Sequence, residues 1–234
     1  MIKIENVGLA SPEQMEFIIE GMRNPMNSWE KSDSYISHEF YLENKASHKV
    51  FKLKEADHSL MQRLSNAGTE HRKYMRMMPV YVRITAPLYW WKEFDTYKVG
   101  TVVNSCSTMH KIQEKEFTME DFSIEHLGYR SLNCFKLMIS ELNLWRRIYI
   151  EGCPEEFDKP EIKPKSKDIW WQMIQLLPSS YNQTRNVMMN YEVLANIYRQ
   201  RRGHKLDEWR EVCKWIESLP YSELITGKED SDNG

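Results

Sequence analysis

The sequence has no apolar stretch that approaches the roughly 20 consecutive residues needed to cross a bilayer as a helix. Its N-terminus, MIKIENVGLASPEQ, lacks the long apolar core of a secretory signal. The 32 lysines and arginines are balanced by 34 aspartates and glutamates, so the chain has no broad basic field for a nucleic-acid backbone. These absences predict a cytoplasmic protein whose partners are neither membranes nor nucleic acids.

Motifs for direct protein chemistry are also missing. The cysteines at positions 106, 134, 153 and 213 are spaced too widely for a zinc motif or a compact disulfide scaffold, so free thiols are expected. The sequence contains no glycine-rich phosphate loop, no G-x-S-x-G and no H-E-x-x-H. No catalytic side chain and no metal site is therefore predicted, and an enzyme of this kind would depend on a bound cofactor.

What the sequence does contain is enough apolar material for a substantial core. Of its 234 residues, 41% are hydrophobic and 28% are charged, as in a globular protein. We expect one domain over residues 1–226 and a disordered polar tail at 227–234. Because helical patterns are the majority and few strands are visible, the predicted fold class is α+β, or mixed α/β.

Apolar periodicity and helix-terminus signals predict the elements. Ser11, Pro12 and Glu13 form a helix start, and Ala67-Gly68 forms a helix end. Lys45-Ala46-Ser47 is expected to be the turn of a hairpin, and residues 151–168 a charged surface loop. The predicted elements are a strand at 1–9, a hairpin within 34–54, a helix or strand at 70–84, and helices at 12–22, 55–66, 131–150, 169–176, 183–201 and 206–218. The helix at 131–150 carries one apolar stripe, formed by Phe135, Met138, Leu142 and Trp145.

Residues 86–112, APLYWWKEFDTYKVGTVVNSCSTMHKI, pass from an aromatic helix start into a cluster of small polar residues. This stretch resembles the flavin-dependent thymidylate synthases, in which an Ala-Pro lead-in and Arg-Gln precede the signature R-H-R-x-x-S-x-N-x-x-S-x-R. With one extra residue before the Asn, the matching positions are Ala86-Pro87, Lys92-Glu93, Thr96-Tyr97-Lys98, Thr101, Asn104, Ser107 and Met109.

A second stretch resembles the same family in the same order along the chain. Leu177-Pro178 and Tyr181 are followed by polar residues at the family's spacing. These residues are Asn190, Asn196, Arg201, His204, Glu208 and Arg210, with one deletion before His204. The resemblance implies a central sheet flanked by helices, and a homotetramer whose active sites are built at subunit contacts. It also implies that FAD, reduced by NADPH, acts with methylenetetrahydrofolate to convert dUMP to dTMP.

The resemblance assigns roles to residues of this sequence. Donors of the Asn and Arg type suit the carbonyl and ring-nitrogen acceptors of a flavin. The expected cofactor-binding residues are Tyr97, Lys98, Asn190, Asn196, Arg201 and His204. The expected substrate-binding residues are Lys92, Glu93, Thr101, Asn104, Ser107 and again Arg201. The segment from Thr101 to Lys111 is interpreted as a nucleotide-binding loop.

Several family cations are replaced in this sequence. Thr96 and Tyr97 stand for an Arg and a His, while Met109 and Ile174 each stand for an Arg. Each charge-assisted hydrogen bond is worth about 1.5–3 kcal/mol, and about 1.4 kcal/mol is a factor of ten in affinity. The cations available to compensate are His110, Lys111 and Arg185.

Two other functions stay open. The chain is alternatively a divergent homologue that binds a nucleotide or flavin with another substrate, or a non-catalytic oligomeric interaction protein that keeps only the fold. At about 100° per residue, Asn190 and Arg201 would share one face of the helix predicted at 183–201. Solvated polar groups on that helix would explain Asn190, Asn196 and Arg201 without a ligand. Core packing would explain Trp90-Trp91.

Overall fold

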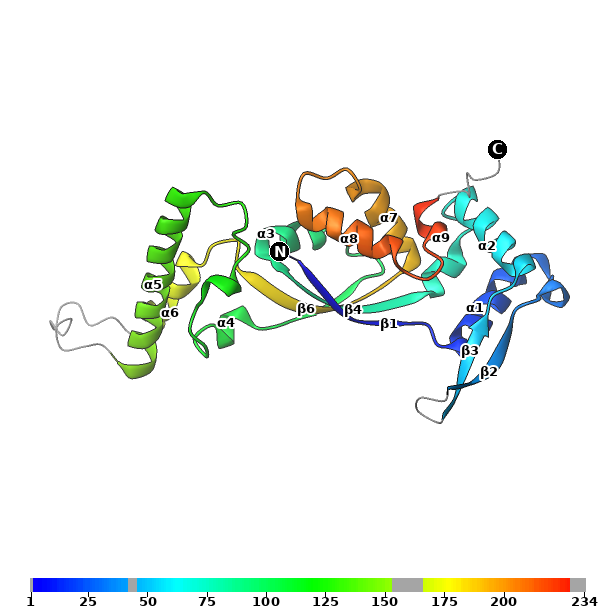
Figure 1. The fold of residues 1–234 in the computed structure, drawn as a ribbon, viewed down its shortest axis with the longest axis horizontal. Coiled ribbons are helices and arrows are strands. Elements are labelled where there is room, and N and C mark those ends of the chain that lie inside the picture. Colours follow the sequence, from blue (N-terminus) through cyan, green and yellow to red (C-terminus); the bar gives the residue numbers. More distant parts are fainter. Residues whose placement is uncertain (1, 42–45, 153–165, 228–234) are drawn as a thin grey trace. The chain divides into compact units, whose positions relative to one another are not determined.

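The computed structural model of the chain describes residues 2–41, 46–152 and 166–227. Helices are the majority element among these residues (Figure 1). In chain order the elements are β1 (Lys3–Leu9), α1 (Pro12–Arg23), η1 (Asn24–Met26), η2 (Trp29–Lys31), β2 (Tyr35–Tyr41), β3 (Ala46–Lys52), α2 (Glu55–Ala67), η3 (Lys73–Met77), β4 (Pro79–Pro87), α3 (Leu88–Phe94), β5 (Val102–Ser105), α4 (Thr108–Lys111), η4 (Met119–Asp121), α5 (Tyr129–Glu151), α6 (Ser166–Leu176), β6 (Asn182–Asn190), α7 (Tyr191–Arg201), α8 (Asp207–Glu217) and α9 (Glu223–Thr226). The predicted mixed α/β class is confirmed.

The described residues form two compact units, and each is described by itself below. The first, called the α5 unit, contains Ile84–Thr96 and Asn104–Arg185 with the first residues of the chain. The second, called the α7 unit, contains Ile4–Arg83, Tyr97–Val103 and the residues from Asn186 onward. The prediction of a single domain over residues 1–226 stays a prediction.

Two sheets are present in the described residues. The larger sheet has the strand order β1-β4-β6-β5. The smaller sheet is the antiparallel pair β2 and β3, in which Tyr35 lies opposite Lys52 and Tyr41 opposite Ala46. The predicted hairpin is confirmed, but its turn is wrong by two residues, because Ala46 and Ser47 already pair as part of β3.

Helix α1 of the α7 unit begins at the capping residue that the sequence indicates. Ser11 Oγ accepts a hydrogen bond from Gln14 N at 3.2 Å, and Gln14 Oε1 accepts one from Ser11 N at 2.8 Å. This reciprocal capping box satisfies two backbone donors that the helix itself leaves unpaired. Helix α1 buries Met15, Ile18 and Ile19. The helix contacts both strands of the hairpin and η3.

A buried ion pair fixes the end of α1 and the start of α2. Arg23 Nε donates to Asp57 Oδ1 at 2.6 Å, and the two side chains are 4% and 0% exposed. The other oxygen of Asp57 accepts from Ser32 Oγ at 2.8 Å and from Ser34 N at 3.0 Å. Burial by itself raises the pKa of Asp57, but hydrogen bonds from Ser34, Arg23 and Ser32 outweigh it and lower this pKa from 3.8 to about 2.

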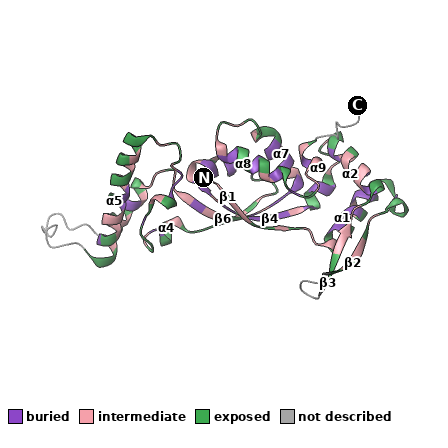
Figure 2. Ribbon diagram, in the orientation of Figure 1, coloured by how far each residue is buried: buried purple, intermediate pink, exposed green. Residues whose placement is uncertain are grey.

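The C-terminal helices of the α7 unit pack around α7, which contacts η3, α8 and α9. Leu194 on α7 and Trp209 on α8 are completely buried. Figure 2 shows buried segments on both helices. Tyr198 Oη on α7 donates to Glu217 Oε1 on α8 at 2.6 Å. This hydrogen bond raises the pKa of Tyr198 to about 12, so the phenol stays protonated and holds the two helices together at neutral pH.

The α5 unit is built on the pair of helices α5 and α6, which lie side by side (Figure 1). Leu142 of α5 and Met173 of α6 are completely buried in one hydrophobic cluster. The predicted stripe on α5 is confirmed, since Phe135, Met138 and Trp145 pack against this cluster. The helix α3 of the same unit buries the aromatic residues Trp90, Trp91 and Phe94 against one another, with ring centroids 4.8–5.3 Å apart.

The helix predicted at 183–201 is wrong in its first half. Residues Asn182–Asn190 form strand β6, and the helix begins only at Tyr191. The alternating burial of Gln183, Val187 and Met189 is typical of a strand, but its first half is polar and its second half contains two methionines, which are good helix formers. Pairing with a strand far away in the chain overrides that local preference.

Other predictions differ in detail. The ambiguous segment 70–84 contains the 3-10 helix η3 and most of β4, and the expected loop Thr101–Lys111 contains strand β5 and the short helix α4.

Among the cysteines of the described residues, Cys106, Cys134 and Cys213 are free. Burial raises the pKa of the Cys213 thiol to about 11, which makes it a poor nucleophile. Cys153, residues 153–165 of the predicted loop and residues 228–234 of the predicted tail lie outside the described residues.

No helix within residues 2–41, 46–152 and 166–227 combines the length and the apolar character that spanning a bilayer requires. In the same part of the chain, no group of three or more histidine, cysteine or acidic side chains is arranged to hold a metal ion.

We expect Asp57→Asn to destabilise the protein by about 3 kcal/mol or more, because it leaves the Arg23 charge buried without a counter-ion. Because the folded pKa of Asp57 lies below the unfolded value, its contribution is fully present above pH 4 and is lost as the pH falls toward 2. Urea unfolding followed by circular dichroism at pH 7 and pH 3 measures both effects.

The matched control is Glu13→Gln, which breaks the exposed Glu13–Lys49 pair of the same unit. An exposed pair contributes little, so the control should unfold like the native protein. Equal unfolding midpoints for the two variants would show that the buried pair is not a major source of stability.

Candidate functional site

The segment Tyr97–Val103, which holds the centre of the family-like signature, packs on the start of α7 within the α7 unit. Gly100 has φ +76°, and a Cβ added there would lie 3.0 Å from Val193 Cγ2 and 3.2 Å from Asn190 Nδ2. Both the left-handed backbone and the close approach favour glycine at this position. The two stretches that carry the family resemblance are therefore in direct contact here.

A second contact between the same two stretches involves Arg201 at the end of α7. Arg201 Nε donates to Tyr97 Oη at 2.8 Å, although the residues are 104 positions apart. The Arg201 guanidinium lies 4.7 Å from the ring centroid of Trp209, a cation–π distance. Tyr97 Oη in turn donates to Gln200 Oε1 at 3.0 Å. The orientation of Arg201 is therefore set by two aromatic side chains.

Asn190 caps α7 and does not belong to its helical face. Its Oδ1 accepts from Val193 N at 3.0 Å, and its φ and ψ of −142° and 171° are extended. The predicted sharing of one helix face by Asn190 and Arg201 is therefore wrong. Because capping uses the amide oxygen, the amide nitrogen of Asn190 keeps the donor character that a flavin carbonyl needs.

The remaining predicted cofactor residues take local roles. Asn196 Oδ1 accepts from Gln200 Nε2 at 2.9 Å and from Arg199 at 3.3 Å. His204 Nδ1 accepts from Leu206 N at 3.2 Å, so the neutral ring carries its proton on Nε2. Lys98 is exposed.

Thr101 belongs to the same segment of the α7 unit. Its hydroxyl is buried and has no hydrogen-bond partner among the described residues. A buried hydroxyl without a partner costs about 1–3 kcal/mol, so the packing around Thr101 must offset that cost.

The predicted substrate residues Lys92, Glu93, Asn104 and Ser107 lie in the α5 unit. Lys92 is exposed and Glu93 half-buried on α3, and Asn104 is exposed near the end of β5. Ser107 caps α4, since its Oγ accepts from His110 N at 3.0 Å. A hydroxyl that accepts one backbone hydrogen bond still has its own proton to donate, so Ser107 can serve both the cap and an anion.

Gln183 holds the residues around Ser107 in place, and the sequence did not indicate it. Gln183 is 8% exposed, and its Nε2 donates to Cys106 O at 3.0 Å and to Thr108 Oγ1 at 3.3 Å. Cys106 N also donates to Thr184 O at 3.0 Å. Strand β6 thus anchors the chain on both sides of Ser107. Gln183 is the second residue of β6, and its side chain is buried. Because this segment was predicted to be a helix, a buried amide was not expected there.

Arg185 continues the same network. It donates to Gln183 Oε1 at 2.8 Å and to Asp95 Oδ1 at 2.7 Å, and its guanidinium lies 4.2 Å from the Trp91 ring centroid. Each of these contacts is satisfied inside the α5 unit. Arg185 is therefore engaged as a structural cation.

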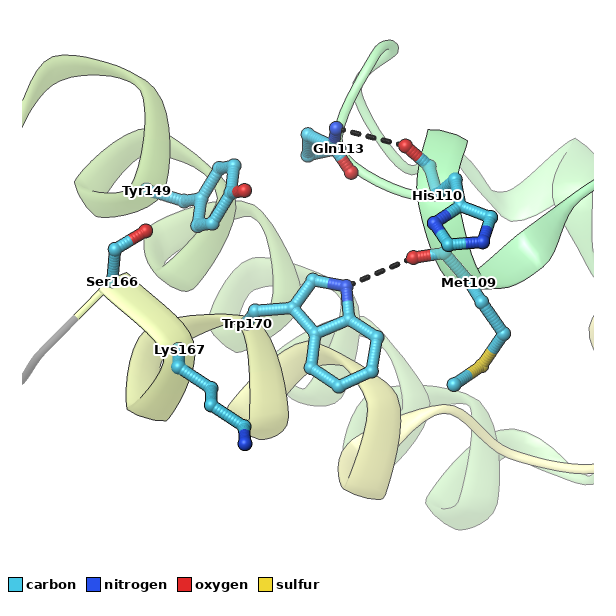
Figure 3. A pocket seen from close by; sticks show the side chains of 7 residues that line it. All are labelled: Met109, His110, Gln113, Tyr149, Ser166, Lys167 and Trp170. Carbon is cyan, nitrogen blue, oxygen red and sulfur yellow. Dashed lines mark hydrogen bonds between the residues drawn. The ribbon is translucent and has the colours of Figure 1, made fainter.

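A cavity of about 550 Å³ lies next to α4 in the α5 unit (Figure 3). It begins at Met109 and His110, directly after Ser107 and Thr108, and α5 and α6 supply the opposite wall. Its volume is in the range of small-molecule sites. The predicted nucleotide segment thus borders a cavity large enough for a ligand.

The sequence matches no protein-family model and no curated protein. The structure is similar to thymidylate synthase X (ThyX) from Helicobacter pylori with FAD and dUMP, with a TM-score of 0.63 and 14% identity. That similarity covers 97% of this chain and 98% of the other. A second structure of the flavin-dependent enzyme from the same organism, complexed with FAD and dUMP, gives a TM-score of 0.59 and 16% identity over the same shares.

The chain has the fold of the flavin-dependent thymidylate synthases. This confirms the fold that the two resembling stretches implied, and it extends over nearly the whole chain. The roles of the individual site residues stay predictions, as does the cytoplasmic location.

For a cofactor of this fold, the residues of the α7 unit fit in their chemistry. The Asn190 amide nitrogen and the Arg201 guanidinium are donors, the class of group that the flavin carbonyls and ring nitrogens require. No acidic side chain stands at the positions that the resemblance assigns to the cofactor. The hydrogen-bond donors of Asn190 and Arg201 therefore match the acceptors of a flavin.

We expect Tyr97→Phe to destabilise the α7 unit by about 1–2 kcal/mol, since it removes the hydroxyl that bonds both Arg201 and Gln200. The ring and its edge contact with Trp209 stay in place. Chemical unfolding measured by tryptophan fluorescence reports the loss. As a control, Tyr81→Phe alters a tyrosine of the same unit that is 52% exposed, and should leave the midpoint unchanged. An unchanged midpoint in Tyr97→Phe would contradict the structural role of this hydroxyl.

Proposed function

We propose that the chain is a flavin-dependent enzyme that methylates a pyrimidine deoxynucleotide, converting dUMP to dTMP with methylenetetrahydrofolate and NADPH. The observation that carries the proposal is the contact between the two resembling stretches, made by Tyr97 with Arg201 and by Gly100 with Asn190. These stretches are 104 positions apart in the chain at Tyr97 and Arg201. Their contact supports a common site. The fold similarity, and the FAD and dUMP of both similar structures, support it further.

Under this proposal, the α7 unit holds FAD, which supplies the hydride when it is bound and reduced. Asn190, at the N-terminus of α7, offers an amide donor next to Gly100, where the missing side chain allows close approach. Arg201, held between Tyr97 and Trp209, offers a cation whose orientation is fixed before any ligand arrives. A donor that is already oriented loses little conformational entropy on binding.

Subunit contacts complete the proposed site, and a homotetramer is part of the proposal. Large apolar side chains remain exposed in each unit, where contacts between copies of the chain would cover them. Tyr129 and Leu137 on α5 are 83% and 72% exposed, and Val99, beside the proposed cofactor residue Lys98, is 91% exposed. Exposed apolar groups next to signature residues fit a site assembled from more than one copy.

One observation favours a second candidate, a divergent homologue that acts on another nucleotide. Met109 and Ile174 cannot donate to a phosphate, and Arg185 is engaged with Asp95 and Trp91. The loss of two charge-assisted contacts would weaken phosphate binding by about two powers of ten or more. The substrate of such a homologue would depend less on arginine contacts to its phosphate.

The direct test is to incubate the purified chain with FAD and measure flavin absorbance after gel filtration. The holoprotein is then assayed for NADPH oxidation and for dTMP with dUMP and methylenetetrahydrofolate. Retained flavin and dTMP are expected. Flavin retention without dTMP would favour the divergent homologue, and a colourless protein that takes up no FAD would overturn both flavin proposals.

Arg201→Ala should reduce FAD affinity by about tenfold or more, because one charge-assisted donor is lost. Arg202→Ala is the matched control, since Arg202 is exposed at the C-cap of the same helix. Circular dichroism at the assay temperature verifies that both variants are folded. Equal FAD affinity of folded Arg201→Ala and the native chain would remove Arg201 from the site.

A further inference from the structure

The cavity beside α4 has a wall that internal hydrogen bonds hold in place. Trp170 Nε1 of α6 donates to Met109 O at 3.0 Å, and Gln113 Nε2 donates to His110 O at 3.1 Å. Arg146 Nε of α5 donates to Gln113 O at 2.9 Å. Behind this wall Ile112 is buried in the core of the α5 unit. Three segments distant in sequence are thus joined around one space before any ligand is present.

The side chains that line this space combine flat rings with nitrogen donors. Figure 3 shows the Trp170 indole in the middle of the labelled side chains, with Tyr149 on one side and Lys167 below. Lys167 is exposed and His110 lies across the cavity from it, and no lining residue of the described chain is acidic. An aromatic face next to an ammonium group suits a ligand that has both a planar ring and a separate anionic group.

The position of the cavity connects it with the proposed substrate. Ser107, which the resemblance assigns to the nucleotide, caps α4, and the cavity opens at Met109 and His110 in the same helix. Met109 stands where the family has an arginine. A lysine from α6 supplies positive charge to the cavity that Met109 also lines.

We infer that this cavity binds the phosphate-bearing substrate, a pyrimidine mononucleotide. Trp170 is the platform for the base, and Lys167, with His110, is the partner of the phosphate. The inference rests on the proposed function for the identity of the ligand, and it assigns residues that the family resemblance does not. One lysine binds a phosphate more weakly than the bidentate guanidinium of an arginine does. Stacking of the base on the Trp170 indole offsets this loss of affinity.

Isothermal titration of the full-length protein, loaded with FAD where FAD is retained, tests the assignment with dUMP and with deoxyuridine. Lys167→Gln should weaken dUMP binding about tenfold and leave deoxyuridine binding unchanged, because deoxyuridine has no phosphate. Trp170→Leu should weaken both ligands by about tenfold, because both contain the base. The difference between the two ligands separates the two roles.

Two matched controls change residues that do not line the cavity. Lys136→Gln removes an exposed lysine of α5, and Trp29→Leu changes a tryptophan of the α7 unit that is 47% exposed. Both should bind dUMP like the native chain. Lys167 is exposed, so its variant is expected to fold even if Trp170→Leu does not.

The assignment of the cavity is overturned if Lys167→Gln binds dUMP as tightly as the native chain, or if it loses deoxyuridine to the same extent as dUMP. In the first case native dUMP binding would leave the proposed function standing with a different site. Failure of the native chain to bind dUMP overturns the inference as well. FAD retention in that same sample then decides whether the flavin part of the proposed function also fails.

Discussion

Arg201 is a charged side chain that contacts two aromatic residues, Tyr97 and Trp209, and much of the candidate cofactor site depends on how its guanidinium is held. A guanidinium is weakly hydrated and planar, so it can lie on the Trp209 ring while its Nε donates to Tyr97. This arrangement holds the end of α7 against α8 and against the segment that follows α3. A lysine would lack the flat face and the fork of donors. The same contact that stabilises the α7 unit also gives Arg201 a fixed orientation.

The α5 unit accommodates its arginine in a comparable way, but with a different consequence. Arg185 lies over Trp91 and pairs with Asp95. It also donates to Gln183, which in turn donates to the backbone oxygen of Cys106. Arg185 Nη1 and Asp95 Oδ1 form an ion pair at 2.7 Å. The structure therefore uses one arginine to shape the chain around Ser107, while the positive charge near the cavity comes from Lys167.

The sequence predicted local features where neighbouring residues decide the outcome. Ser11 and Gln14 form a capping box because both partners lie within one turn, and the stripe Phe135, Met138, Leu142 and Trp145 needs only helical periodicity. The β6 strand was missed because its first half is polar and its second half contains two methionines, which are good helix formers. For the same reason the interpretation of Asn190 as a mid-helix residue was wrong, since its capping role exists only if the strand ends there.

For the candidate site, the resemblance brought Tyr97, Asn190 and Arg201 into one hypothesis, but the chain order alone does not say which atoms meet. The sequence by itself determined the cap of α1, the amphipathic helices and the mixed class of the fold, because these depend on interactions within a few residues. Tertiary structure alone decided that Gly100 approaches Asn190, that Arg201 lies between Tyr97 and Trp209, and that Lys167 and Trp170 line a cavity with His110. Those contacts join residues that are tens of positions apart, and their free energy comes from strand pairing and core packing that no local pattern contains.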